Sequence, residues 1–189
     1  DRIFGERAAS YFRLRHRPAL QRLLNQANRS REVDPGLRGR LHWLLGNTRQ
    51  AQEDLETAAE RGDAQALLFL GIFWLKFNTK TAAAYLKRAA RQAVNRPWAH
   101  LWLAAAHLEK PKGAVQALAC LELCRGAGAD SLFLYRLLKT VAHLDNASWE
   151  KADASSGRLI ALAPDSPVGY SFRFQARLAQ GKIDGAVSD

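Results

Sequence analysis

The chain of 189 residues is 48% hydrophobic and 24% charged, which is typical of globular proteins and long enough for one domain or a linear array of repeats. No apolar run approaches the roughly 18 to 20 residues that cross a bilayer, and the N-terminal DRIFGER lacks the apolar core of a secretory signal. The net charge of +10 is concentrated in residues 1–50, which hold eleven arginines against four acidic residues. Such a basic region attracts nucleic acid, an anionic membrane surface or an acidic protein.

Residues 1–34 are the least regular part of the sequence. Ala19 and Leu23 fit the spacing of the repeat described below, but Gln26 takes the next inward place. Pro18 is compatible with the first turn of a helix, so we predict a degenerate first unit or cap over residues 1–34. The arginines here are spaced as on a helix surface, which fits a solvated face and also a patch that binds nucleic acid. The candidate basic residues are Arg13, Arg17, Arg22, Arg29, Arg38 and Arg40.

From residue 35 onward the sequence repeats with a period of about 34 residues. Alanines recur at separations of 31, 35, 35 and 34 residues, and small or apolar residues follow the first four of them at four and seven positions, with Ser156 as the polar exception. This spacing is one face of a helix, so we predict that these residues are the inward stripe of the second helix of each unit. The stripe residues are Ala51, Leu55, Ala58, Ala82, Leu86, Ala89, Ala117, Leu121, Cys124, Ala152, Ser156, Leu159 and Ala186.

An apolar segment of helical length precedes each stripe, and turn signals separate the two segments. We therefore predict an all-α fold, an α-solenoid of about five stacked antiparallel helix pairs wound as a right-handed superhelix, in a single domain of residues 1–189. The predicted repeat units are 35–62, 63–96, 97–129 and 130–164, followed by a truncated last unit, 165–189. The sequence has no methionine and stops early in a helix, so we expect the native protein to be longer.

The second unit resembles the tetratricopeptide repeat and its Sel-like relative, through Leu70, Gly71, Trp74, Ala82, Tyr85, Leu86 and Ala89. The resemblance extends over roughly residues 35–189. It implies a concave surface lined by the second, fifth, ninth and twelfth positions of the first helix of each unit. The corresponding residues are Gln65, Leu68, Ile72 and Leu75; Trp98, Leu101, Ala105 and Leu108; Tyr135, Lys139 and Ala142; and Val168, Ser171, Gln175 and Leu178.

The content of this groove is mainly apolar. Family members that hold a C-terminal carboxylate carry lysine and asparagine at the fifth and ninth positions, whereas this chain has Leu68 with Ile72 and Leu101 with Ala105. The sequence thus departs from the carboxylate-binding pattern. An apolar groove fits the buried face of an amphipathic helix, an extended peptide with bulky side chains, or a flanking segment of the same protein.

No group of residues indicates catalysis, a cofactor or a metal site. His100 and His107 share a helix face, but neither belongs to an HExxH arrangement, so packing or solvated histidines are the favoured interpretation. Cys120 and Cys124 lie four apart on one predicted helix, farther than a disulfide allows, and we expect free thiols. Free thiols favour the cytoplasm, and the periplasm stays open if a signal was removed.

Large aromatic residues are interleaved with basic ones, a pattern that also occurs where single-stranded nucleic acid is stacked. Packing as wedges between successive helices is the favoured interpretation. We expect Trp98 and Trp149, at predicted helix starts, to be the most exposed. The aromatic residues concerned are Trp43, Phe73, Trp74, Trp98, Trp102 and Trp149.

These features favour a non-enzymatic scaffold or adaptor that binds an amphipathic or acidic segment of a protein partner through the apolar groove, with the N-terminal arginines steering the acidic part. Bacterial proteins that mix the two repeat types resemble assembly factors of the cell envelope or of secretion. One alternative is binding of nucleic acid or an anionic polymer through the arginines. Another is a regulatory domain attached to an enzyme outside this sequence.

Overall fold

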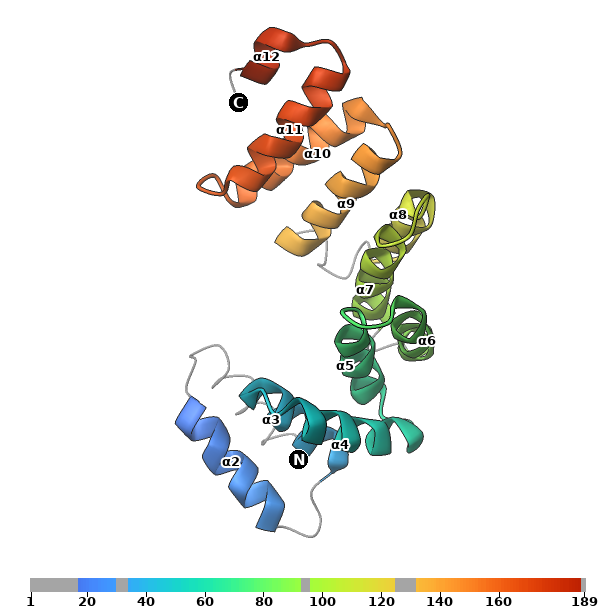
Figure 1. Ribbon diagram of the computed structural model, residues 1–189, viewed down its shortest axis with the longest axis vertical. Coiled ribbons are helices and arrows are strands. Elements are labelled where there is room, and N and C mark those ends of the chain that lie inside the picture. Colours follow the sequence, from blue (N-terminus) through green and yellow to red (C-terminus); the bar gives the residue numbers. More distant parts are fainter. Residues whose placement is uncertain (1–16, 30–33, 93–95, 125–131, 188–189) are drawn as a thin grey trace. The chain divides into compact units, whose positions relative to one another are not determined.

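The computed structural model describes residues 17–29, 34–92, 96–124 and 132–187, and all regular structure in these ranges is helical (Figure 1). The predicted all-α fold is thus confirmed. The chain divides into two compact lobes, residues 1–95 and 96–189, and each lobe is described by itself. None of the described helices is both long and apolar enough to cross a bilayer.

The N-terminal lobe is a stack of helices in which each helix packs on the next. Its helices are α2 (Arg17–Arg29), α3 (Pro35–Leu45), α4 (Thr48–Glu60), α5 (Ala64–Trp74) and α6 (Thr79–Ala90). In addition to neighbours in sequence, α3 packs against α5. This pattern, in which the first helix of one pair contacts the first helix of the next, is that of a solenoid of antiparallel helix pairs.

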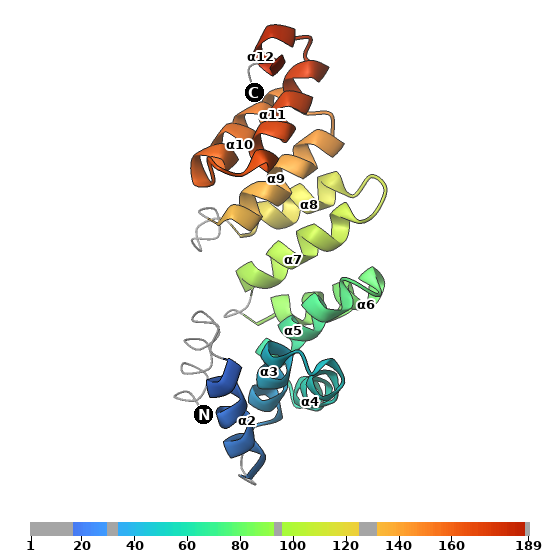
Figure 2. The ribbon, with the colours of Figure 1, turned by 60° about the vertical axis from the view of Figure 1, so that its left-hand side comes forward.

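The C-terminal lobe follows the same plan. Its helices are α7 (Arg96–Leu108), α8 (Ala114–Glu122), α9 (Phe133–Asp145), α10 (Trp149–Leu162), α11 (Pro167–Ala179) and the short α12 (Ile183–Val187). Neighbours in sequence pack together, and α9 contacts both α7 and α11, so that α9, α10 and α11 lie side by side (Figure 2).

Side-chain caps fix where several helices begin. Asp34 accepts a hydrogen bond from the Leu37 amide at 3.0 Å at the start of α3, and Asp63 accepts from the Gln65 amide at 2.7 Å at the start of α5. Asn78 caps α6 in the same way, through the amides of its first turn. These carbonyl and carboxylate oxygens satisfy amide groups that have no partner inside the helix, and each cap stabilises its helix by roughly 1 kcal/mol.

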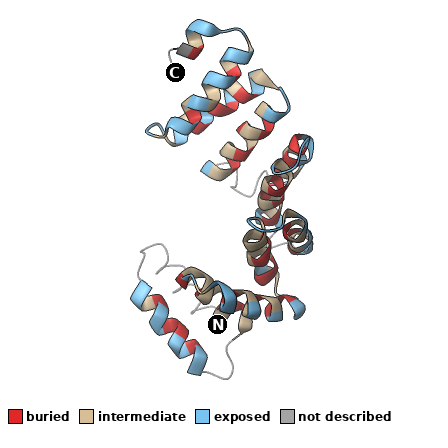
Figure 3. Cartoon of the chain, viewed as in Figure 1, coloured by how far each residue is buried: buried red, intermediate tan, exposed pale blue. Residues whose placement is uncertain are grey.

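The predicted inward stripes form the core of the helix pairs, as the buried strips in Figure 3 illustrate. Every stripe residue from Ala51 to Leu159 is at most 1% exposed. Ser156 is fully buried as well, and its hydroxyl donates to the Ala152 carbonyl oxygen at 2.7 Å, which removes the penalty of an unpaired polar group. The stripes are therefore confirmed.

The first described helix differs from the prediction in register. The buried face of α2 is formed by Leu20, Leu23, Leu24 and Ala27 instead of Ala19, Leu23 and Gln26. These side chains pack on apolar residues of α3 and cover it. The four leucine and alanine positions bury more apolar surface than the alternative face, which contains Gln26, so the hydrophobic effect selects them.

Candidate interaction surface

Helix α5 is apolar on almost every side, with Gln65 as its only polar residue. Its fully buried side, which includes Ala66 and Leu70, packs on neighbouring helices. On the other side Gln65 is exposed, and Leu68, Ile72 and Leu75 are half-buried. These are the four predicted groove residues of this helix pair. An amphipathic helix would carry polar residues there, so this face is apolar beyond what the lobe's own packing requires.

An aromatic cluster adjoins this face of α5. The Trp43 ring of α3 lies 6.2 Å from Phe69 and 5.7 Å from Phe73, measured between ring centroids. Phe73 in turn contacts Trp74 at 5.5 Å and Phe77 at 5.2 Å. Most of these contacts are edge-to-face, the arrangement that aromatic rings prefer. Packing between helices, predicted for Trp43, Phe73 and Trp74, is thus what these rings do.

Phe77 ends the cluster in the turn between α5 and α6 and is 69% exposed. Phe77 is thus a large apolar side chain that contacts another ring while two thirds of its surface is in water. Neither Phe69 nor Phe77 was predicted as an interaction residue. Their only signal in the sequence is their place in the apolar run that continues past the end of α5.

In the C-terminal lobe some of the predicted groove residues are accessible and others are buried. Trp98 is 41% exposed, and Ala105 and Leu108 are half-buried. Leu101 and Tyr135, in contrast, are both 1% exposed and belong to one core cluster. Both are core residues and not groove residues.

The reason is the position of α7, which packs on both α8 and α9. The fifth position of α7 therefore faces the core instead of solvent. Trp102 lies on the same helix face as Trp98 and Ala105, because the three positions are spaced i, i+4, i+7, and its side chain is half-buried. Trp102, which was predicted to pack between helices, thus also continues the partly accessible face of α7. Trp149, predicted to be exposed, is also half-buried.

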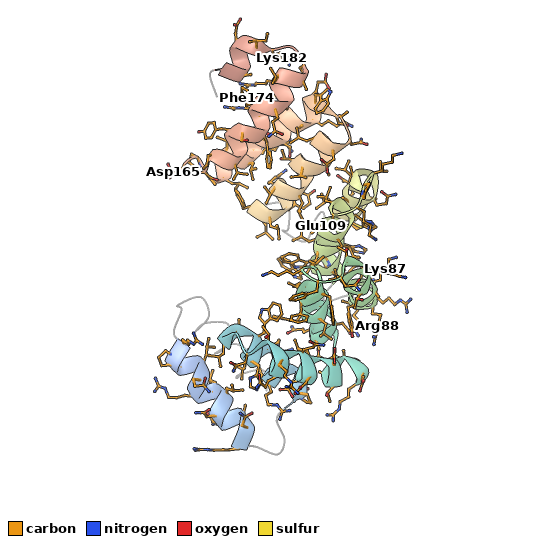
Figure 4. All side chains as sticks on the ribbon, in the orientation of Figure 1. Lys87, Arg88, Glu109, Asp165, Phe174 and Lys182 are labelled. Carbon is orange, nitrogen blue, oxygen red and sulfur yellow. The ribbon has the colours of Figure 1, made fainter. Side chains whose placement is uncertain are left out.

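The remaining candidates of this lobe fall into two sets. Lys139 is half-buried, and its ammonium group contacts Glu122 Oε1 at 3.2 Å and the Tyr135 hydroxyl at 3.5 Å, while Ala142 is fully buried. On α11 the candidates are accessible, because Ser171 and Gln175 are exposed. Three exposed apolar residues, Val168, Phe174 and Leu178, share this face of α11, and Figure 4 labels Phe174.

The predicted basic residues do not form one free patch. The Arg38 guanidinium binds both carboxylate oxygens of Asp54, its Nε donating to Oδ2 at 2.8 Å. The Arg40 Nη1 lies 3.5 Å from Asp63 Oδ2. Arg17 donates to the Leu45 carbonyl oxygen at 3.2 Å. Arg22 and Arg29 are exposed, and Arg13 lies outside the described residues.

The histidines and cysteines form no metal-binding cluster in the described ranges. His100 and His107 are half-buried on one face of α7, and no group of three metal-ligating side chains occurs among the described residues. Cys120 and Cys124 are free thiols, as predicted. Burial raises the pKa of Cys124 to about 12, with Cys120 acting in the same direction, so this thiol stays protonated and unreactive at neutral pH.

Comparison with solved structures shows the fold. A MamA mutant is 20% identical, with coverage of 82% of this chain and 90% of that chain and a TM-score of 0.69. A crystal structure of MamA is 18% identical over 79% of this chain and 82% of its own, with a TM-score of 0.68. A tetratricopeptide repeat protein from Parabacteroides merdae is 11% identical over 99% of this chain and 76% of its own, with a TM-score of 0.65. The chain therefore has a tetratricopeptide-like helical-repeat fold.

No protein-family model matches the sequence, and no curated protein matches it significantly. Structural likeness at these identities extends to the fold alone.

Proposed function

We propose that this protein is a non-enzymatic scaffold that binds an apolar segment of a protein partner on the α3–α5 face of its N-terminal lobe. The observation that carries the proposal is the accessible side of α5, where Leu68, Ile72 and Leu75 stand half-buried next to the aromatic cluster that ends at Phe77. Apolar side chains left in contact with water are stabilised when a partner covers them, by roughly 25 cal/mol per Å² of apolar area.

The shape and chemistry of this face favour an amphipathic helix or an extended peptide with bulky side chains. Leu68, Ile72 and Leu75 follow one another at helical spacing on a single face, which matches apolar anchors repeating at three and four residues on a partner helix. A terminal carboxylate is disfavoured as the main determinant, since Leu68 and Ile72 offer no cationic or amide donor.

The test is to place a charge in the middle of this face. The intact protein is used as bait in its native source to identify the partner, and the affinity for that purified partner is then measured by calorimetry. We expect Leu68→Asp and Ile72→Asp each to weaken binding by about tenfold or more, because a carboxylate would be desolvated against an apolar segment. The matched control is Gln116→Asp on the exposed side of α8, which should bind like the wild type.

If both α5 variants keep the wild-type affinity for the partner, and circular dichroism shows that they keep the wild-type helix content, the proposal is contradicted. Leu101 is not a useful target for this experiment. It is a core residue, and a charge there would unfold the C-terminal lobe instead of probing its surface.

The alternative function, binding of nucleic acid or another anionic polymer, has exposed Arg22 and Arg29 in its favour. Arg38 and Arg40 are weaker contributors, because their charges are already paired with carboxylates. Affinity that falls steeply between low and moderate salt is the signature of phosphate contacts. A filter-binding titration with a single-stranded oligonucleotide at two salt concentrations therefore separates the alternative from the scaffold.

We further propose that the protein acts within a bacterial cell-envelope or secretion assembly. This part of the proposal is based on the resemblance to proteins that mix tetratricopeptide and Sel-like repeats. The partner identified with the intact bait tests it. Recovery of a component of such an assembly supports the setting, and recovery of an unrelated partner discards it while leaving the apolar-face proposal in place.

A further inference from the structure

The N-terminal lobe carries a second concentration of positive charge on and around α6, apart from the arginines of residues 1–50. Residues 64–92 contain five basic residues and no acidic residue. These cations therefore have no carboxylate partner within their own segment, and any acidic neighbour comes from another helix. The basic residues are Lys76, Lys80, Lys87, Arg88 and Arg91.

One side of α6 forms an open depression with a volume of about 500 Å³. Its lining residues are spaced i, i+1, i+4, i+5 and i+8, which is one face of a helix, and the fully buried stripe of α6 lies on a different face. The volume is in the range of sites that hold a small molecule or a few residues of a peptide. The lining residues are Lys80, Thr81, Ala84, Tyr85 and Arg88.

Arg88 is held in place at the end of this depression. Its Nη2 donates to the Ala59 carbonyl oxygen at 3.3 Å, and its guanidinium carbon lies 5.9 Å from the centre of the Tyr85 ring. Figure 4 shows Arg88 and its neighbour Lys87 projecting outward from α6. A guanidinium that is already oriented loses less side-chain freedom when it binds an anion.

The charges around the depression leave two cations available. Among the described residues, neither Lys80 nor Arg88 forms an ion pair. The acidic residues that face this side come from α4, where Glu56 and Glu60 act on Tyr85. Burial raises the pKa of Tyr85, with Glu56 acting in the same direction, so its hydroxyl stays protonated and can donate to an anion.

We propose that the α6 depression binds an acidic segment of a protein partner, with Lys80 and Arg88 contacting its carboxylates and Tyr85 packing against its aliphatic stems. This inference rests on the proposed scaffold function but uses a surface other than the apolar face of α5. A protein segment fits better than nucleic acid, because Tyr85 is a single ring already approached by Arg88, and a binder of single strands presents several free rings for successive bases.

The experiment uses a fluorescein-labelled peptide of eight glutamates as the probe, with binding followed by fluorescence anisotropy at low salt. Lys80→Ala combined with Arg88→Ala should weaken binding by about fivefold or more, as expected for the loss of two partly exposed charge contacts. The matched control is Lys76→Ala combined with Lys87→Ala, which removes the same charge from the same segment but from outside the depression. The control should lose less than about twofold.

A second pair of variants guards against loss of folding in the Arg88 variant. Lys80→Ala alone, whose side chain makes no hydrogen bond among the described residues, should weaken binding by about twofold to threefold. Arg88→Lys keeps the charge but loses the fork of the guanidinium, and should lie between the wild type and the double variant.

Three results would overturn the proposal. These are no binding of the peptide to the wild type, an equal loss in the depression variant and its control, or tighter binding of an eight-residue thymidine oligonucleotide that the same variant abolishes. The last outcome would assign the site to nucleic acid. The Leu68→Asp variant should keep its affinity for the glutamate peptide, so failure of this proposal and failure of the scaffold proposal are distinguishable.

Discussion

Gly71 of α5 lies directly against Leu86 of α6, so closely that a methyl group added at Gly71 would fall 2.5 Å from Leu86 Cγ. The preceding helix pair has the same relationship, since a methyl group at Gly39 would fall 2.8 Å from Leu55 Cγ. Both leucines are fully buried stripe residues. In these two pairs the helices therefore meet where a glycine of the first helix lies against a leucine of the second, and the close approach requires the absence of a side chain at the glycine.

Gly71→Ala should destabilise the N-terminal lobe. Overpacking a buried contact costs about 1 to 3 kcal/mol, and the higher helix propensity of alanine offsets up to about 1 kcal/mol of it. We expect a net loss of roughly 1 to 2 kcal/mol, measured by urea unfolding monitored by circular dichroism. The control is Gly157→Ala in the interior of α10, where an added methyl group meets nothing within 4 Å. That variant should gain about 0.5 to 1 kcal/mol, and a loss of the same size at both positions would contradict the packing explanation.

Asp54 of α4 links two side chains of α3, and its charge should matter more than that of its neighbour Glu53. Asp54 accepts both hydrogen bonds of Arg38 and lies 3.9 Å from His42 Nε2, and its side chain is only 13% exposed. Asp54→Asn should cost about 1 to 2 kcal/mol, the lower end for a charge-assisted pair because Arg38 is 37% exposed. Glu53→Gln breaks only the exposed pair with Arg49 and should leave the urea midpoint almost unchanged. Equal midpoints for the two variants would disprove the difference.

The repeat of small and apolar residues in the sequence was sufficient to predict which residues form the buried core of each helix pair. The alanine and leucine stripes are fixed by one rule, that small and apolar residues recur on one helix face, and this rule depends on nothing outside each helix. Ser156 fits the same stripe because its hydroxyl can bond to Ala152 within its own helix. Such local rules explain why the fold class could be predicted from a single sequence.

The surface could be predicted only in part, because exposure depends on which face of a helix its neighbours cover. The groove positions of α5 are accessible although α5 packs on α3, α4 and α6. Leu101, in contrast, lies on the face of α7 that joins the core cluster with residues of α8 and α9. In the same way, the sequence alone suggested that Arg38 and Arg40 were available to bind an anionic partner. Their acidic partners, Asp54 and Asp63, lie 16 and 23 residues farther along the chain and only tertiary structure brings them close.

Cys124 should react with thiol reagents only when its lobe unfolds. The thiol is fully buried, lies 3.2 Å from the Pro97 carbonyl oxygen and has its pKa raised to about 12 by burial. In a Cys120→Ser variant at pH ~8, we expect the reaction with a chromogenic disulfide to be at least about a hundredfold slower in the native protein than in denaturant. The reciprocal variant, Cys124→Ser, keeps the half-buried Cys120 and should react faster in the native state. Rapid labelling of Cys124 without denaturant would show that α8 opens locally.

His143 should make the C-terminal lobe less stable in mild acid. Its side chain is 8% exposed and Nδ1 has no hydrogen-bond partner among the described residues. Its pKa is lowered, first by burial and then by Lys139 of α9 and Lys151 of α10, while Glu122 of α8 opposes them. The folded chain therefore takes up this proton less readily than the unfolded chain, whose histidine titrates near ~6.5. The contribution of the neutral His143 to the free energy of unfolding is therefore fully present above that pH. It is lost as the pH falls toward the lowered pKa of the folded state.

The measurement is the urea midpoint at pH ~7.5 and pH ~5.5 for the wild type and for His143→Gln. A glutamine cannot take up a proton, so the variant should lose less stability between the two pH values, even if it is less stable than the wild type at both. Any cost of the substitution that does not depend on pH cancels in this difference. Gln116→Asn on the exposed side of α8 serves as the control and should show the full wild-type loss. If His143→Gln shows the same loss as this control, His143 is not the group that senses acid, and the buried histidine acts through packing alone.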